Sequence, residues 1–158
     1  MELDKIIKGY EKYKTEDILL GTELPLELID FKPSVDDLNA FCKKVPKLRE
    51  KGYETSLAWY LTALIQKCDN KKITLKLPWI LKIFTLKDLG YKLEDKEITV
   101  DGNLGSGAFM YARDCLVEIK GKVGLYFGHI AQRCSFKVKG KVGKNPLQNA
   151  YNCRLEII

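Results

Sequence analysis

Residues 98–154 read ITVDGNLGSGAFMYARDCL, then VEIKGKVGLYFGHIAQRCS, then FKVKGKVGKNPLQNAYNCR, which makes three consecutive units of 19 residues. A fixed period of this kind is the sequence signature of a repeat architecture. After the third unit, LEII begins the pattern again at Leu155. The residues that recur in register are Gly102, Gly121 and Gly140; Gly105, Gly124 and Gly143; Ala112, Ala131 and Ala150; and Cys115, Cys134 and Cys153.

Each unit opens with alternating apolar and polar residues, as in the VEIK of 117–120, which predicts a half-buried strand. The two glycines that follow predict a backbone corner with permissive φ, and the apolar residue between them returns to the interior. Nineteen residues leave little room for a packed helix. We therefore expect the units to stack as coils of a parallel β-helix, about 4.8 Å apart, with Ala and Cys filling the interior.

The repeat resembles a known family. It is similar to the Gly-x-Gly-x-Gly repeat domain found at the C-terminal end of the glutamate synthase large subunit and in one of the subunits of formylmethanofuran dehydrogenase. The residues that carry the resemblance are Val117, Ile119, Gly121, Gly124, Tyr126 and Gly128. The resemblance implies a right-handed β-helix and a scaffolding or docking role, with the chemistry in other domains. Because Gly90 lies two periods before Gly128, a partial earlier coil is expected over about 73–97.

The chain departs from that family at two places. First, each coil of the family ends in Met-x-Gly-Gly, and this chain has alanine there instead, with cysteine in place of the final Gly. Second, the third coil lacks the Tyr and Gly that match Tyr126 and Gly128. The resemblance therefore carries an expectation about the fold and hardly any about activity.

The first half of the chain has a helical rather than a strand-like pattern. Leu3, Ile6, Ile7 and Tyr10 recur at the spacing that forms one apolar stripe on a helix. Ser34 is a helix cap with Asp37 three residues later, and a third apolar stripe runs over about 55–68. The expected fold is thus α+β, with a helical segment over 1–72 that caps the solenoid and a right-handed β-helix of three to four coils over 73–158.

Composition restricts the class of protein. The 158 residues are 46% hydrophobic and 30% charged, which is typical of one globular domain. Nothing in the sequence approaches a run of 18 apolar residues, and the opening residues have no secretory pattern, so neither a membrane span nor a signal peptide is expected. Five cysteines in a chain of this length fit a reducing compartment. We expect a cytoplasmic location.

No motif predicts catalysis. The segment 102–107, GNLGSG, superficially evokes a nucleotide loop, but its glycine order is wrong and GKVG recurs in both later coils, which favours a structural corner. Cysteines 19 residues apart do not form a zinc pattern, so buried packing is favoured. His129 is the only histidine and is expected to be exposed on a corner. We expect no enzyme, no cofactor and no metal.

Polar residues also share ladder positions, and the excess charge lies in the repeats. Residues 1–72 hold 13 basic and 13 acidic side chains, and residues 73–158 hold 14 and 8. A stacked lysine face would attract a polyanion such as nucleic acid, which is the alternative function. Its residues are Lys120, Lys122, Lys137, Lys139, Lys141 and Lys144. Two further sets of polar residues recur at equivalent positions of successive coils, and we expect them to form either solvated corners or a polar binding strip. They are Arg113, Gln132 and Tyr151, and Asp114, Arg133 and Asn152.

The favoured function comes from the end of the repeat. A fourth coil begins at Leu155, so its strand would leave an unpaired edge and an apolar end. Leu155, Ile157 and Ile158 are the candidate interaction residues. We expect a non-enzymatic assembly module that forms a homo-oligomer or joins a larger complex through this end. Charging Ile157 is expected to release the partner.

Overall fold

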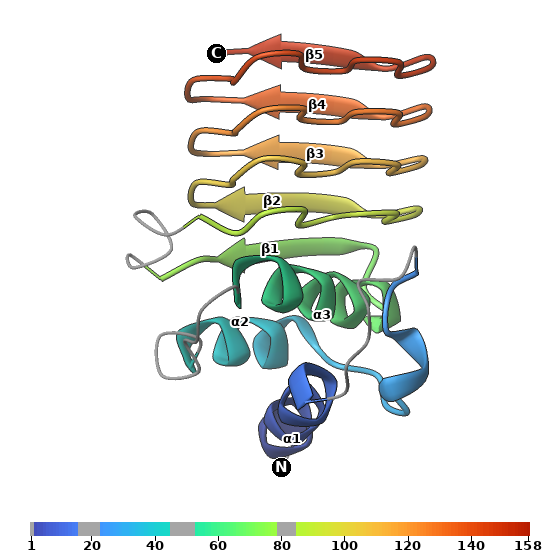
Figure 1. The fold of residues 1–158 in the computed structure, drawn as a ribbon, viewed down its shortest axis with the longest axis vertical. Helices are drawn as coiled ribbons and strands as arrows, with labels where there is room; N and C mark the ends of the chain where they lie inside the picture. The colour runs from blue at the N-terminus through green and yellow to red at the C-terminus, as the bar shows by residue number, and fades with distance from the viewer. Residues whose placement is uncertain (1, 16–22, 45–52, 79–84) are drawn as a thin grey trace.

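The computed structural model describes residues 2–15, 23–44, 53–78 and 85–158, in which helices precede a parallel sheet wound into a solenoid (Figure 1). The helices lie at one end of the solenoid, and the last strand lies at the other. The elements are α1 (Glu2–Thr15), the 3-10 helix η1 (Leu26–Leu28), α2 (Val35–Lys44), α3 (Tyr53–Lys67), β1 (Lys72–Lys76), β2 (Glu97–Asp101), β3 (Leu116–Ile119), β4 (Ser135–Val138) and β5 (Arg154–Ile157).

The strands form one sheet in the order β1-β2-β3-β4-β5, and every neighbouring pair is parallel. From β2 onward the register repeats every 19 residues, because Ile98 pairs with Val117, Val117 with Phe136, and Phe136 with Leu155. The first coil is longer, since Ile73 pairs with Ile98. The predicted α+β fold, with helices followed by a parallel β-solenoid of 19-residue coils, is confirmed.

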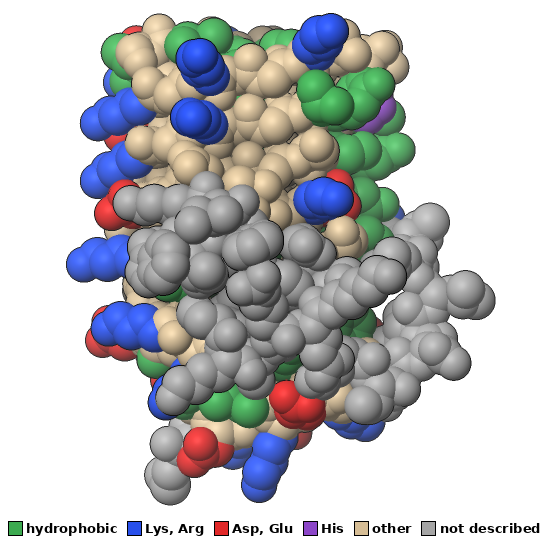
Figure 2. Space-filling view, turned by 60° about the vertical axis from the view of Figure 1, so that its left-hand side comes forward, with side chains coloured by type: hydrophobic (Ala, Val, Ile, Leu, Met, Phe, Trp, Pro, Cys, Tyr) green, Lys and Arg blue, Asp and Glu red, His purple; other side chains and the backbone are tan. Residues whose placement is uncertain are grey.

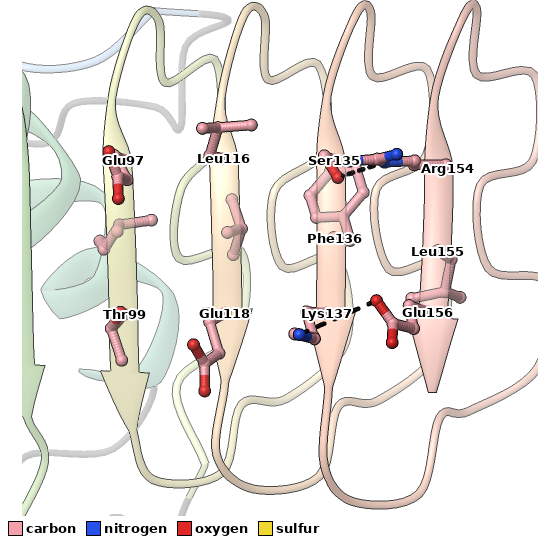
Figure 3. A pocket seen from close by; sticks show the side chains of 12 residues that line it. Glu97, Thr99, Leu116, Glu118, Ser135, Phe136, Lys137, Arg154, Leu155 and Glu156 are labelled. Carbon is pink, nitrogen blue, oxygen red and sulfur yellow. Dashed lines mark hydrogen bonds and ion pairs between the residues drawn. The ribbon is translucent and has the colours of Figure 1, made fainter. Parts of the chain in front are cut away.

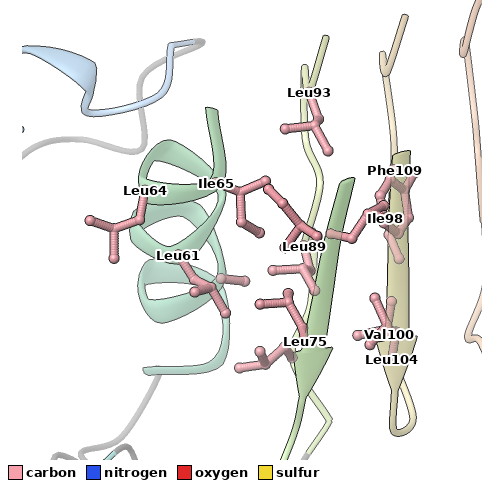
Figure 4. Close-up of a cluster of buried hydrophobic side chains, with 14 of the residues drawn as sticks. Leu61, Leu64, Ile65, Leu75, Leu89, Leu93, Ile98, Val100, Leu104 and Phe109 are labelled. Atoms are coloured by element: carbon pink, nitrogen blue, oxygen red, sulfur yellow. The ribbon is translucent and has the colours of Figure 1, made fainter. Parts of the chain in front are cut away.

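Inward side chains of successive strands stack into a continuous apolar interior. Leu75, Val100, Ile119 and Val138 form one such column, and all four are fully buried. This interior continues into the helices. Figure 4 shows Ile65 on the side of α3 that faces Leu89 and Leu93 of the first coil. The solenoid and α3 therefore share one hydrophobic core.

The glycine corners have a different cause from the one predicted. Of the six corner glycines, only Gly102 has a positive φ (155°), so the corner does not depend on left-handed backbone at the others. The stacked coils instead approach too closely for a side chain. A Cβ on Gly124 would lie 2.6 Å from the carbonyl carbon of Gly105, and one on Gly143 would lie 2.5 Å from that of Gly124. Glycine is required there by space rather than by φ.

Left-handed backbone occurs instead in the second half of each coil, at four positions that recur with the same period. Most of these residues are not glycine, and Ile130, a β-branched residue with a φ of 56°, has a conformation that such residues rarely adopt. The positions are Asp88, Gly107, Tyr126 and Asn145; Gly90, Phe109, Gly128 and Leu147; Lys92, Tyr111, Ile130 and Asn149; and Asp95, Asp114, Arg133 and Asn152. The return path of the coil is therefore a series of tight turns.

Two polar side chains join the helices to the β1 end of the solenoid. The side-chain amide of Asn39 in α2 donates to Thr74 O at 2.9 Å and accepts from Lys76 N at 2.7 Å, as a neighbouring strand would do. Lys96 is almost fully buried, and its ammonium donates to the carbonyls of Cys68 and Asn70, just beyond α3. A cation at a helix C-terminus is stabilised by the helix dipole.

Candidate interaction site at the end of the solenoid

The inward side chains of β5 and of the coil that precedes it are uncovered. Ile157 is 60% exposed, whereas Val138, its register partner in β4, is fully buried. Leu155 is half-buried, whereas its partner Phe136 is buried. The other half-buried apolar residues of this coil are Val142, Leu147, Ala150 and Cys153. The residues that would be core one coil earlier thus form an apolar surface here, which we call the β5 end.

The backbone of β5 is open along one edge. Arg154 N donates to Cys134 O at 3.2 Å, and Ile158 N donates to Val138 O at 2.9 Å, so these groups point toward β4. The backbone N–H and C=O groups of successive residues in a strand point alternately to its two edges, so those of Leu155 and Ile157 point away from β4. Within the described residues β5 pairs with β4 alone. The edge therefore offers N–H and C=O groups to a further strand.

The structure brings the three predicted interaction residues together but on two faces. Leu155 and Ile157 lie in the inward columns, in register with Phe136 and Val138. Ile158 is 56% exposed and follows Ile157, so it belongs to the outward side of the strand. The apolar end is thus formed by Leu155 and Ile157, and Ile158 lies at its border.

The outer face of the sheet mixes charges rather than stacking lysines alone. Lys137 Nζ lies 3.9 Å from a carboxylate oxygen of Glu156, and Lys139 Nζ lies 3.6 Å from one of Glu118. Figure 2 shows basic side chains stacked along one edge of the solenoid, with acidic side chains between some of them. The other four lysines of the predicted face are exposed and form no ion pair within the described residues: Lys120, Lys122, Lys141 and Lys144.

A shallow trough of about 340 Å³ crosses this outer face, perpendicular to the strands. Figure 3 shows two rows of outward side chains, one with Glu97 and Arg154 and the other with Glu118 and Glu156. Arg154 Nε donates to Ser135 Oγ at 2.8 Å, so these two neighbours in the first row are hydrogen-bonded. The trough carries both signs of charge and ends at β5.

A second hollow of about 620 Å³ lies where the helices meet the coils, and it includes part of the predicted polar strip. Its cations are already paired with neighbouring anions. Arg113 forms an ion pair with Glu94, and Lys92 Nζ lies 2.8 Å from Glu23 Oε1. On the adjacent ladder, the guanidinium of Arg133 donates to both carboxylate oxygens of Asp114, at 2.7 Å each. The two arginine pairs hold successive coils to one another, and the Lys92–Glu23 pair joins the first coil to the helical half of the chain.

The cysteine ladder consists of free thiols that point along the coils. Each Sγ bonds to the carbonyl oxygen two residues earlier, at 3.1 Å for Cys115, 3.2 Å for Cys134 and 3.4 Å for Cys153. Cys115 and Cys134 are buried, and burial raises the pKa of the half-buried Cys153 thiol. In the described part of the chain, no group of three or more His, Cys, Asp or Glu side chains could hold a metal ion.

The expectation of an exposed His129 is wrong. The ring is half-buried and lies edge-on to Tyr126, with 5.9 Å between ring centroids, and its Nδ1 is buried without a hydrogen-bond partner. Figure 2 shows this single histidine among hydrophobic side chains. Left-handed backbone at Tyr126 and Gly128 turns the chain just before His129, and the Tyr126 ring packs against the imidazole, which removes part of its surface from water.

The geometry defines the class of this protein as a β-solenoid with an N-terminal helical segment. No family model matches the chain, and neither a curated protein nor a solved structure shows a significant match. None of the helices in the described ranges is both long and apolar enough to cross a membrane.

Proposed function

We propose that this protein is a non-enzymatic assembly module that docks onto a protein partner through the β5 end. The observation that carries the proposal is the uncovered coil interior beside an open strand edge. Ile157 is 60% exposed at a position that is fully buried in the coil before it. Covering this surface would remove apolar area from water and satisfy edge hydrogen bonds in one step.

The outer face gives weaker support to the alternative, polyanion binding. Two of its six lysines, Lys137 and Lys139, already lie near acidic side chains. Nucleic-acid binding is salt-dependent because phosphate contacts release counterions. Retention on heparin that is lost as salt rises would therefore favour the lysines, whereas association through an apolar end would persist.

The proposal extends to the family and the location. Parallel coils of 19 residues with glycine corners support a relationship to the Gly-x-Gly-x-Gly repeat domains, which scaffold or dock other domains. Five free thiols, Cys42 among them, support a reducing, cytoplasmic environment.

The test is the solution mass of the protein by light scattering at low and high salt, for the wild type and for Ile157→Asp. We expect a mass above that of one chain at both salt concentrations and a lower mass for the variant, because a carboxylate in the apolar end opposes its burial. Thr99→Asp is the matched control, since Thr99 is an outward residue of β2. A mass that Ile157→Asp leaves unchanged would count against docking through this end.

A further inference from the structure

Resting on the proposed function, we infer that the occupant of the β5 end is a second copy of this chain, joined by antiparallel pairing of the two β5 strands about a twofold axis normal to the sheet. Such an axis extends the sheet across the interface and keeps both inward faces on the same side. The two uncovered coil interiors would then cover each other. The assembly is closed, with two chains.

The opposite end of the solenoid cannot serve as the second surface. The outer edge of β1 already has hydrogen-bond partners, because Asn39 bonds to Thr74 O and Lys76 N. The helices also cover this end, as Figure 1 shows. Stacking of β5 onto β1 of another copy, which would give an open filament, is therefore blocked, and the β5 end has only its own equivalent to meet.

The hydrogen-bonding pattern of β5 suits an antiparallel neighbour. The backbone N–H and C=O groups that point away from β4, toward the open edge, belong to Leu155 and Ile157. By the same alternation, those of Cys153 also point toward the open edge. With Leu155 opposite Leu155 of the second copy, Ile157 lies opposite Cys153 of the second copy. In this register, each residue whose backbone N–H and C=O point away from β4 lies opposite another such residue. Each side chain that faces the interior also lies opposite one that faces the interior.

The charges of β5 select that register. Centring the pair on Arg154 would place two arginines opposite each other, and centring it on Glu156 would place two glutamates opposite each other. Centring it on Leu155 places Arg154 opposite Glu156 of the second copy, and symmetry makes this pair twice. Facing side chains of antiparallel strands have Cβ atoms about 4.5–5.5 Å apart, which allows an ion pair. The strand RLEI is thus complementary to itself in one register.

The test uses two charge-reversal variants: each would repel a copy of itself across the interface, whereas the two together would attract each other. Arg154→Glu would leave two glutamates facing each other in its own homodimer, and Glu156→Arg would leave two arginines. We expect each variant to dissociate about tenfold or more readily than the wild type, because two attractive cross-strand pairs become repulsive. An equimolar mixture restores both pairs, so we expect it to form a heterodimer with the mass of two chains.

Controls on an inner coil separate this effect from a general change in charge. Lys120→Glu and Glu118→Arg make the same charge changes on the outer face near β3, away from the open edge, and should stay dimeric. Circular dichroism of all variants establishes that each is folded. A mixture of the two β5 variants that remains monomeric, or a wild type that is monomeric, overturns the inference.

The failure of this arrangement can be distinguished from the failure of the proposed function. If Ile157→Asp dissociates the wild-type oligomer while the mixture of charge variants does not reassociate, the β5 end is a docking surface but the antiparallel pairing is wrong. If Ile157→Asp leaves the oligomer intact, docking through the β5 end is itself wrong.

Discussion

Replacing Gly124 by alanine tests whether the close approach of coils holds the solenoid together. The new Cβ would lie 2.6 Å from both Gly105 C and Ser106 N. Ordinary van der Waals contact begins at about 3.4 Å, so the two coils must separate by roughly 0.8 Å at this corner. Both neighbours are backbone atoms, which cannot rotate away. The separation would also lengthen the hydrogen bond from Gly124 N to Gly105 O, which is 3.3 Å long.

We expect Gly124→Ala to lower the free energy of unfolding by about 3 kcal/mol. Overpacking costs about 1–3 kcal/mol, and a weakened backbone hydrogen bond costs about 1 kcal/mol more. Urea unfolding followed by circular dichroism measures the change, with Lys122→Ala as a control at an exposed position of the same corner. A loss below about 1 kcal/mol would refute the reasoning, since it would mean that the coils move apart easily.

Three further predictions concern the helical end. Lys96→Met should lower the free energy of unfolding by about 2 kcal/mol in urea, because two backbone carbonyls beyond α3 lose their donor. Asn39→Ala should cost about 1 kcal/mol and speed hydrogen exchange of the Lys76 amide, whose acceptor it removes. Burial raises the pKa of the Cys42 thiol to about 12, above about 8.5 in the unfolded chain. The stability that the neutral Cys42 thiol contributes is thus complete below about pH 8.5 and falls by about 1.4 kcal/mol per pH unit above it. Cys42→Ala should therefore reduce the slope of the free energy of unfolding against pH by about this amount in urea titrations at pH 8 to 10.

The strands and their register could be predicted because the period of the sequence is the period of the coils. Alternation at 117–120 identified a strand, and the spacing of equivalent residues fixed which strands pair. The return path was missed, because its left-handed positions mix Gly, Asp and Asn with residues that have no preference for this backbone, such as Phe109 and Ile130, and no residue type occupies any of the four positions in every coil. Gly107 and Gly128 also tolerate this backbone, but the third coil carries the clearest signal, since asparagine occupies three of its four left-handed positions: Asn145, Asn149 and Asn152.

The docking of the helices was equally hidden, since it depends on single polar side chains rather than on a pattern. The one available signal was a break in the repeat. Lys96 occupies the position that Cys115 fills one period later, as the hydrogen bond from Leu116 N to Lys96 O shows. A lysine in a buried column needs partners that the repeat itself does not contain, so it marks the coil where something else must meet the solenoid.

The two ends of this solenoid differ in whether the rest of the described chain covers the open strand edge and the apolar interior. Any stack of parallel coils leaves one strand edge and one apolar cross-section at each end. At β1, Asn39 supplies the hydrogen bonds of a missing strand, and α3 supplies the apolar contacts of a missing coil. At β5 neither is present among the described residues, yet RLEI alternates inward apolar and outward opposite charges in a way that matches its own reverse. An edge that only had to avoid contact would be favoured to carry like charges, which repel a second copy. The opposite charges of Arg154 and Glu156 lack that protection, which is the physical ground for expecting a partner there.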